Sequence, residues 1–142
     1  MILTLFFASV FVLTASVIAF ILNRRRPTVP TQPKFDYPKQ INRADFSEPN
    51  KPWLIVLFTS LTCDSCQDLA IKAQPLASSD VEVQEVEFSA NRELHARYQI
   101  DAVPTVVIAD RMGVVHNGFV GPISATDLWA TVAKLRELPI NH

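Results

Sequence analysis

Two cysteines follow directly after a continuous apolar run, and this arrangement restricts the fold more than any other feature of the sequence. Residues Trp53–Thr59 (WLIVLFT) carry no charge, as is typical of a strand covered on both faces of a sheet. Cys63 and Cys66 come next, at the start of a segment with apolar residues at helical spacing. A strand that leads at once into a helix indicates an α/β fold.

The residues beyond the cysteines alternate between strand and helix patterns. We expect Thr62 to cap a helix that starts near Cys63, and Pro75 to bend or close it. The later predicted elements are a strand over Val81–Phe88, a short helix over Asn91–Tyr98, strands over Thr105–Ala109 and Val114–Val120, and a last helix opened by a capping box at Ser124 and Asp127. This order predicts a mixed β-sheet flanked by helices.

Length and composition exclude several classes of protein. The chain has 142 residues, which suits one domain of ordinary size rather than two. Its 13 basic and 14 acidic side chains give a net charge of −1, so no basic excess exists to neutralise nucleic-acid phosphates. An apolar fraction of 49% excludes a fully disordered chain. Two cysteines are too few for a disulfide-rich secreted scaffold.

The segment Ile2–Leu22 contains no charged residue. As a helix it would be about 32 Å long, close to the ~30 Å thickness of the bilayer hydrocarbon. The alternatives are a buried helix of a globular core and a cleaved signal peptide. A signal peptide usually has a basic region first, which is missing here, and the candidate cleavage site at Val17 and Ala19 lies inside the apolar run. We therefore predict a transmembrane anchor over residues 1–22 that contacts the lipid bilayer through residues 2–22.

A basic and proline-rich linker is predicted over residues 23–39. Arg24, Arg25 and Arg26 follow the apolar segment, and the positive-inside rule places such clusters in the cytoplasm. The expected location is a single-pass protein of the cell membrane with a cytoplasmic domain; the inverted, extracytoplasmic orientation is the alternative. Four prolines between positions 27 and 38 favour an extended linker. The folded domain is predicted over residues 40–142.

The position of the Cys-x-x-Cys pair predicts its chemistry. A cysteine at a helix N-terminus faces unpaired backbone N–H groups and the positive end of the helix dipole, which both favour the thiolate. Cys63 is therefore the predicted exposed nucleophile. Cys66 lies one turn later on the same face and is the predicted buried thiol that resolves a mixed disulfide.

Three other interpretations of the pair stay open. A structural disulfide would close so short a loop that it would constrain little chain entropy. A zinc site would need two further ligands, and His95, His116 and His142 are scattered and expected at the surface. The third interpretation is that both cysteines are chemically inert. We expect no metal and no organic cofactor, only a redox-active disulfide between Cys63 and Cys66.

The pair and a distant Val103-Pro104-Thr105 together resemble the thioredoxin family over roughly Gln40–Glu137. The resemblance implies a thioredoxin-like fold and a cis Val103–Pro104 bond that faces the disulfide. It also implies that substrate binds along Val103, Pro104, Thr105 and Gly121, where a backbone can pair with an extended peptide. Phe58 is expected to pack beneath the motif.

The sequence departs from the family in the loop that carries the cysteines. The usual Gly-Pro between them is Asp64-Ser65 here, and Thr62 replaces an aromatic residue. An anion beside Cys63 disfavours its thiolate, while the Ser65 hydroxyl offsets part of this effect. Because strong oxidants are those whose reduced form is stabilised, we expect a reducing protein.

The buried acid that the family carries six residues before the first cysteine is Leu57 in this sequence. In the family this acid takes the proton of the resolving thiol. Glu85 is a candidate substitute, because it falls on the same side of its strand as Val81 and Val83. The alternative is that Glu85 is simply a solvated strand residue.

These observations predict a membrane-anchored thiol–disulfide oxidoreductase that reduces protein disulfides. Its expected partners are protein disulfide substrates, an unidentified electron donor and the lipid bilayer, and no nucleic acid. The alternatives are an extracytoplasmic thiol reductase in protein maturation and a non-catalytic thioredoxin-like module for binding or redox sensing.

Overall fold

The computed structural model describes Thr14 and residues 36–137. Thr14 apart, the predicted anchor lies outside the described residues, as does most of the predicted linker. Within the described part of the chain, no helix has the length and apolar character needed to cross a bilayer.

Four strands of the described residues form one sheet in the order β2-β1-β3-β4, and it is mixed, as the sequence predicts. They are β1 (Trp53–Thr59), β2 (Val81–Glu87), β3 (Thr105–Asp110) and β4 (Val115–Val120). The central strand β1 is parallel to β2 and antiparallel to β3, and β3 is antiparallel to β4. Every residue of β1 is buried, which explains its continuous apolar sequence. The strands β2 and β4 lie at the edges of the sheet.

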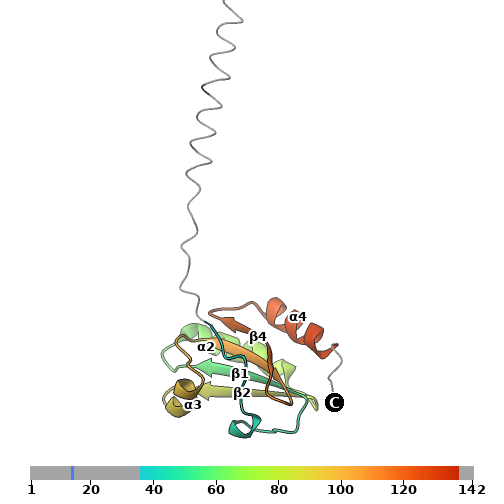
Figure 1. The fold of residues 1–142 in the computed structure, drawn as a ribbon. Coiled ribbons are helices and arrows are strands. Elements are labelled where there is room, and N and C mark those ends of the chain that lie inside the picture. Colours follow the sequence, from blue (N-terminus) through green and yellow to red (C-terminus); the bar gives the residue numbers. More distant parts are fainter. Residues whose placement is uncertain (1–13, 15–35, 138–142) are drawn as a thin grey trace, which may run out of the picture. The chain divides into compact units, whose positions relative to one another are not determined.

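Helices cover both faces of the sheet (Figure 1). One face is covered by α2 (Asp64–Ala73) and α4 (Ala125–Arg136). The other is covered by α3 (Arg92–Arg97) and by the segment that contains the 3₁₀ helix η1 (Arg43–Asp45).

Each face has its own hydrophobic core. Alternate residues of β1 contribute to opposite cores, because successive strand side chains point to opposite faces. The core under α2 and α4 contains Trp53, Ile55, Leu57, Leu69, Ala73, Val81, Val106, Ile108, Leu128, Val132 and Leu135. The core on the α3 face contains Ile41, Phe46, Leu54, Val56, Phe58, Val86, Tyr98, Val107 and Ala109.

The N-terminus of α2 differs from the sequence prediction. Cys63 itself is the N-cap residue of α2, and no side chain caps this helix, so the prediction of a Thr62 cap was wrong. Pro75 closes the helix as predicted, because α2 passes there into the 3₁₀ helix η2 (Gln74–Leu76). The Ser124 cap is confirmed: its hydroxyl accepts a hydrogen bond from the backbone N–H of Asp127 at 3.1 Å.

On the α3 face, polar side chains fasten the segment before β1 to the sheet. The guanidinium of Arg43 is buried and donates to the backbone oxygens of Asp110 (2.9 Å) and Glu48 (3.0 Å). The Tyr98 hydroxyl accepts from the Asn42 N–H at 3.0 Å and donates to the Asp45 carboxylate at 2.5 Å.

Candidate active site

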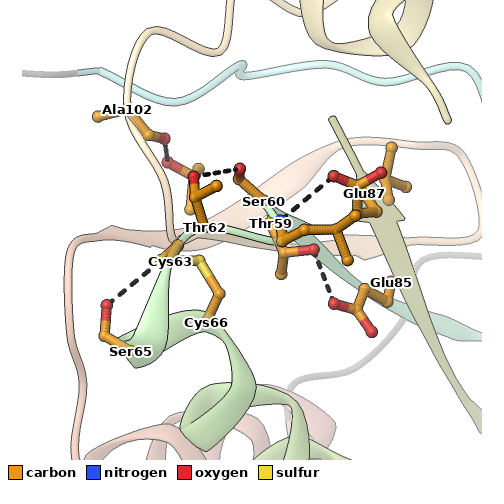
Figure 2. Close-up of a disulfide and its surroundings, with 12 residues drawn as sticks. Thr59, Ser60, Thr62, Cys63, Ser65, Cys66, Glu85, Glu87 and Ala102 are labelled. Carbon is orange, nitrogen blue, oxygen red and sulfur yellow. Dashed lines mark hydrogen bonds between the residues drawn. A yellow bond between two sulfur atoms is a disulfide. The ribbon is translucent and has the colours of Figure 1, made fainter. Parts of the chain in front are cut away.

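A disulfide joins Cys63 and Cys66 where β1 leads into α2 (Figure 2). The S–S distance is 2.13 Å and the two Cα atoms are 5.3 Å apart. A turn precedes it, in which the Cys63 N–H donates to the Ser60 oxygen at 3.1 Å. The strand and the helix therefore fix the pair from both sides, as the sequence predicts.

The two cysteines differ in exposure. Cys66 is 1% exposed, whereas Cys63 is only half-buried. Cys63 also occupies the N-cap position of α2, where the helix N-terminus favours a thiolate. The Ser65 hydroxyl lies 3.5 Å from its sulfur and Asp64 is exposed in the first helical turn. The geometry thus supports an accessible first sulfur and an enclosed second one.

A cis Val103–Pro104 bond precedes β3, in agreement with the family resemblance. Thr105 is paired with Phe58 near the end of β1, so this bond lies at the same end of the sheet as the disulfide. Pro104 and Thr105 are buried, and the Pro104 oxygen accepts from the Gly121 N–H at 2.8 Å. Gly121 has φ +96°, a conformation that side chains disfavour. The structure brings these predicted substrate-binding residues together.

The position of the missing family acid is apolar. Leu57 is fully buried in the core under α2 and α4. Glu85 faces the same side of the sheet, but its side chain is exposed. Its Oε1 accepts a hydrogen bond of 2.7 Å from the Thr59 hydroxyl, at the end of β1 (Figure 2). The carboxylate thus reaches toward the end of the strand that leads to Cys63, without being buried.

Sequence reasoning missed Glu87, the last residue of β2. Its carboxylate accepts from the backbone N–H groups of Leu61 (3.3 Å) and Ala90 (3.0 Å). The pKa of Glu87 is lowered, chiefly by a backbone hydrogen bond from Ser89. Nothing in the strand pattern marks this residue, because its partners lie in two separate loops.

The structure corrects two further expectations. Phe58 does not lie under α2: it packs on the α3 face, with its ring edge-to-face to His95 at 5.2 Å. His95 is not at the surface but 3% exposed, and its Nε2 lies 2.9 Å from the Val86 oxygen. His116 contacts the Asp110 carboxylate at 2.7 Å, and His142 lies outside the described residues.

Comparison with known proteins gives a consistent result. The thioredoxin family model matches residues 35–134. A thioredoxin from Fasciola hepatica is 29% identical, with a TM-score of 0.54 over 61% of this chain and 84% of that one. A mutant thioredoxin from Halobacterium salinarum is 24% identical, with a TM-score of 0.58 over 65% of this chain and 81% of that one.

Deadhead, a germline-specific thioredoxin of Drosophila melanogaster, has the same fold at 23% identity, with a TM-score of 0.55 over 61% of this chain and 84% of that one. No curated protein matches the sequence. The family match spans most of the chain and includes the disulfide pair, which supports thiol–disulfide oxidoreductase activity. The chain belongs to the thioredoxin family.

Proposed function

We propose that this protein reduces disulfides in other proteins. The observation that carries the proposal is the unequal exposure of the two sulfurs at the N-terminus of α2. The Cys63 thiolate attacks a substrate disulfide, forms a mixed disulfide and releases one substrate thiolate, which takes up a proton. Cys66 then attacks the Cys63 sulfur, releases the second substrate thiol and restores the Cys63–Cys66 disulfide. Two electrons pass to the substrate, and a dithiol donor must reduce the pair again.

Insulin reduction by dithiothreitol tests this proposal. The wild-type chain should accelerate the reaction, and Cys63→Ser should abolish the acceleration. Cys66→Ser should instead accumulate the mixed disulfide, because the resolving thiol is missing. Full activity of Cys63→Ser would refute the assignment of the nucleophile.

The substrate backbone is expected to pair with Val103, next to the cis bond. No backbone hydrogen bond of Val103 occurs within the described residues, so its N–H and C=O are available to an extended peptide. Thr105 and Gly121 hold this loop: the Thr105 hydroxyl donates to the Ala102 oxygen at 2.7 Å, and Gly121 donates to Pro104. A peptide bound there would lie beside the accessible sulfur.

In this chain, Leu57 occupies the position of the family's buried acid. We propose that Glu85 instead accepts the proton of the resolving thiol of Cys66. Support comes from its hydrogen bond to Thr59 at the end of β1. Since the carboxylate is exposed, it can exchange its proton directly with water. In Glu85→Gln, the rate of mixed-disulfide resolution should fall and its pH dependence should change. An unchanged pH profile would remove Glu85 from the mechanism.

The proposed direction of electron flow is reducing. Asp64 places a carboxylate in the first turn of α2, next to Cys63, and this charge disfavours the thiolate. A reduction potential near or below that of glutaredoxins, about −200 mV or lower, is expected for the pair. A clearly higher potential would indicate an oxidant instead.

The proposed location is the membrane surface, with the apolar residues 2–22 as the anchor and the domain in the cytoplasm. Its support is the uncharged sequence of that segment and the arginines that follow it. Labelling of Cys63 by a membrane-impermeant thiol reagent in intact cells tests the orientation. Protection until lysis is expected; labelling in intact cells would favour an extracytoplasmic reductase in protein maturation.

The buried Leu57 favours one alternative, a binding or redox-sensing module without catalytic turnover. Such a module would form a single mixed disulfide per chain and then stop. Multiple turnovers of insulin reduction per molecule would decide for the enzyme.

A further inference from the structure

The loop before the nucleophile Cys63, residues 60–62, has few attachments. The Leu61 side chain is 73% exposed and Thr62 is also exposed. The Ser60 and Thr62 hydroxyls form a hydrogen bond of 3.2 Å, but this bond lies within the loop. In the part of the chain that the structure describes, this loop has two hydrogen bonds to residues outside it: the Ser60 oxygen accepts from the Cys63 N–H that follows, and the Leu61 N–H donates to Glu87 of β2.

Glu87 makes this attachment from a fixed position. Its backbone is paired with Thr59 at the end of β1, and the next N–H, that of Phe88, donates to the Thr59 oxygen at 2.9 Å. The Glu87 oxygen accepts from both the backbone N–H (2.9 Å) and the side chain (3.2 Å) of Asn91. The carboxylate therefore extends from a rigid base.

The same carboxylate also holds the turn between β2 and α3. Its Oε2 accepts from the Ala90 N–H at 3.0 Å, while Oε1 accepts from the Leu61 N–H at 3.3 Å. An ionised carboxylate only accepts hydrogen bonds, so both oxygens suit these donors. The lowered pKa of Glu87, caused first by the Ser89 N–H, agrees with this role.

We infer that Glu87 is a positioning residue, which clamps the loop before Cys63 to the turn after β2 and thereby sets the reactivity of the Cys63 thiol. Cys63 depends on its N-cap position, because the backbone N–H groups of α2 stabilise the thiolate only in the correct orientation. A free loop would let the sulfur move from this position. The effect on protein substrates rests on the proposed function; the effect on the thiol does not.

Two variants separate position from charge. Glu87→Asp keeps the charge but is one methylene shorter, so it cannot reach both loops. Glu87→Gln keeps the length but loses the charge and replaces one accepting oxygen by an amide that can only donate. Glu93→Gln is the matched control, because this glutamate on α3 is 84% exposed and its partner is Arg97.

Two readouts are needed. The pH dependence of iodoacetamide alkylation, measured in a Cys66→Ser background, gives the pKa of the Cys63 thiol. Insulin reduction gives kcat/KM in chains that keep both cysteines. We expect both Glu87 variants to raise the pKa of the Cys63 thiol and to lower kcat/KM about tenfold, because small displacements of a reacting group are costly. The Glu93 variant should change neither quantity.

Two results would overturn the inference. A lower Cys63 pKa in Glu87→Gln with no change in Glu87→Asp would show that only the charge acts. Unchanged alkylation profiles in both variants, with a lower free energy of unfolding, would leave Glu87 a purely structural role. A wild-type chain that fails to reduce insulin would refute the proposed function, while the alkylation profiles would still test the clamp.

Discussion

The two faces of the sheet are held by different interactions. Under α2 and α4 the buried side chains of the described residues are apolar except for Thr59 at the end of β1, and the helices rest on them mainly through non-directional packing. On the α3 face the core is interrupted by buried polar groups, namely Arg43, His95 and the hydroxyl of Tyr98. The difference follows from what covers each face. Long regular helices satisfy their own backbone, whereas an irregular segment with a short 3₁₀ helix needs side chains to bind it.

The difference between the two faces also affects the active site. The helix that carries the cysteines lies on the apolar face, where it packs on a core of apolar side chains. The loop that leads into it is instead held by a carboxylate. Apolar packing of the helix and a polar attachment of the loop thus meet at Cys63.

The largest effect is expected from a cavity on the apolar face. Leu128 of α4 is fully buried, so Leu128→Ala should lower the free energy of unfolding by about 3 kcal/mol. Ile71→Ala on α2 is the control, because the Ile71 side chain is 74% exposed and its removal should change the free energy of unfolding little. Denaturant titration measures both. A loss below about 1 kcal/mol for Leu128→Ala would mean that this face is loosely packed.

A smaller effect is expected from a buried polar group on the other face. Arg43→Met keeps the apolar stem but removes the bonds to Asp110 and Glu48, and should cost about 1.5 kcal/mol. Arg111→Met at an exposed neighbour is the control. Increased stability of Arg43→Met would instead show that burying the cation, whose Nε has no partner among the described residues, costs more than its two bonds contribute.

The smallest effect is a difference in pH dependence between the faces. The Tyr98 hydroxyl and then Arg97 hold the pKa of Asp45 below its ordinary value. A carboxyl with a lower pKa in the folded state stabilises the fold above its unfolded pKa, and this contribution is lost as the pH falls through the folded pKa. Asp45→Asn should therefore be destabilised at pH 7, and the deficit should shrink below about pH 4.

Leu128→Ala is the matched reference for this measurement, because Leu128 packs among apolar side chains. Its deficit should stay constant with pH. Parallel pH profiles for the two variants would contradict the polar character assigned to the α3 face.

Sequence patterns recover the elements but not every contact between them. The continuous apolar run of β1 and the Ser124 cap are local signals, and the structure confirms both. The predicted N-cap, Thr62, is wrong by one residue, because the turn at Ser60 makes Cys63 the N-cap residue of α2. Local rules therefore predict element types better than their ends.

Contacts between distant segments leave no such pattern. His95 lies on a six-residue helix, too short for a periodic signal, and its burial between Phe58 and Phe88 depends on the packed sheet. Glu87 resembles any charged residue at a strand end until its carboxylate is seen against Leu61. Predicting either residue would require the tertiary structure first.

The edge position of β2 has a consequence for how copies of this protein meet. An edge strand presents unpaired backbone groups on which another molecule can extend the sheet, a common route to aggregation. The sequence of β2 places Glu82, Glu85 and Glu87 along this strand, so two copies that joined there would bring like charges together. We expect this edge strand to resist fibril growth and to limit aggregation even at high local concentrations of the protein.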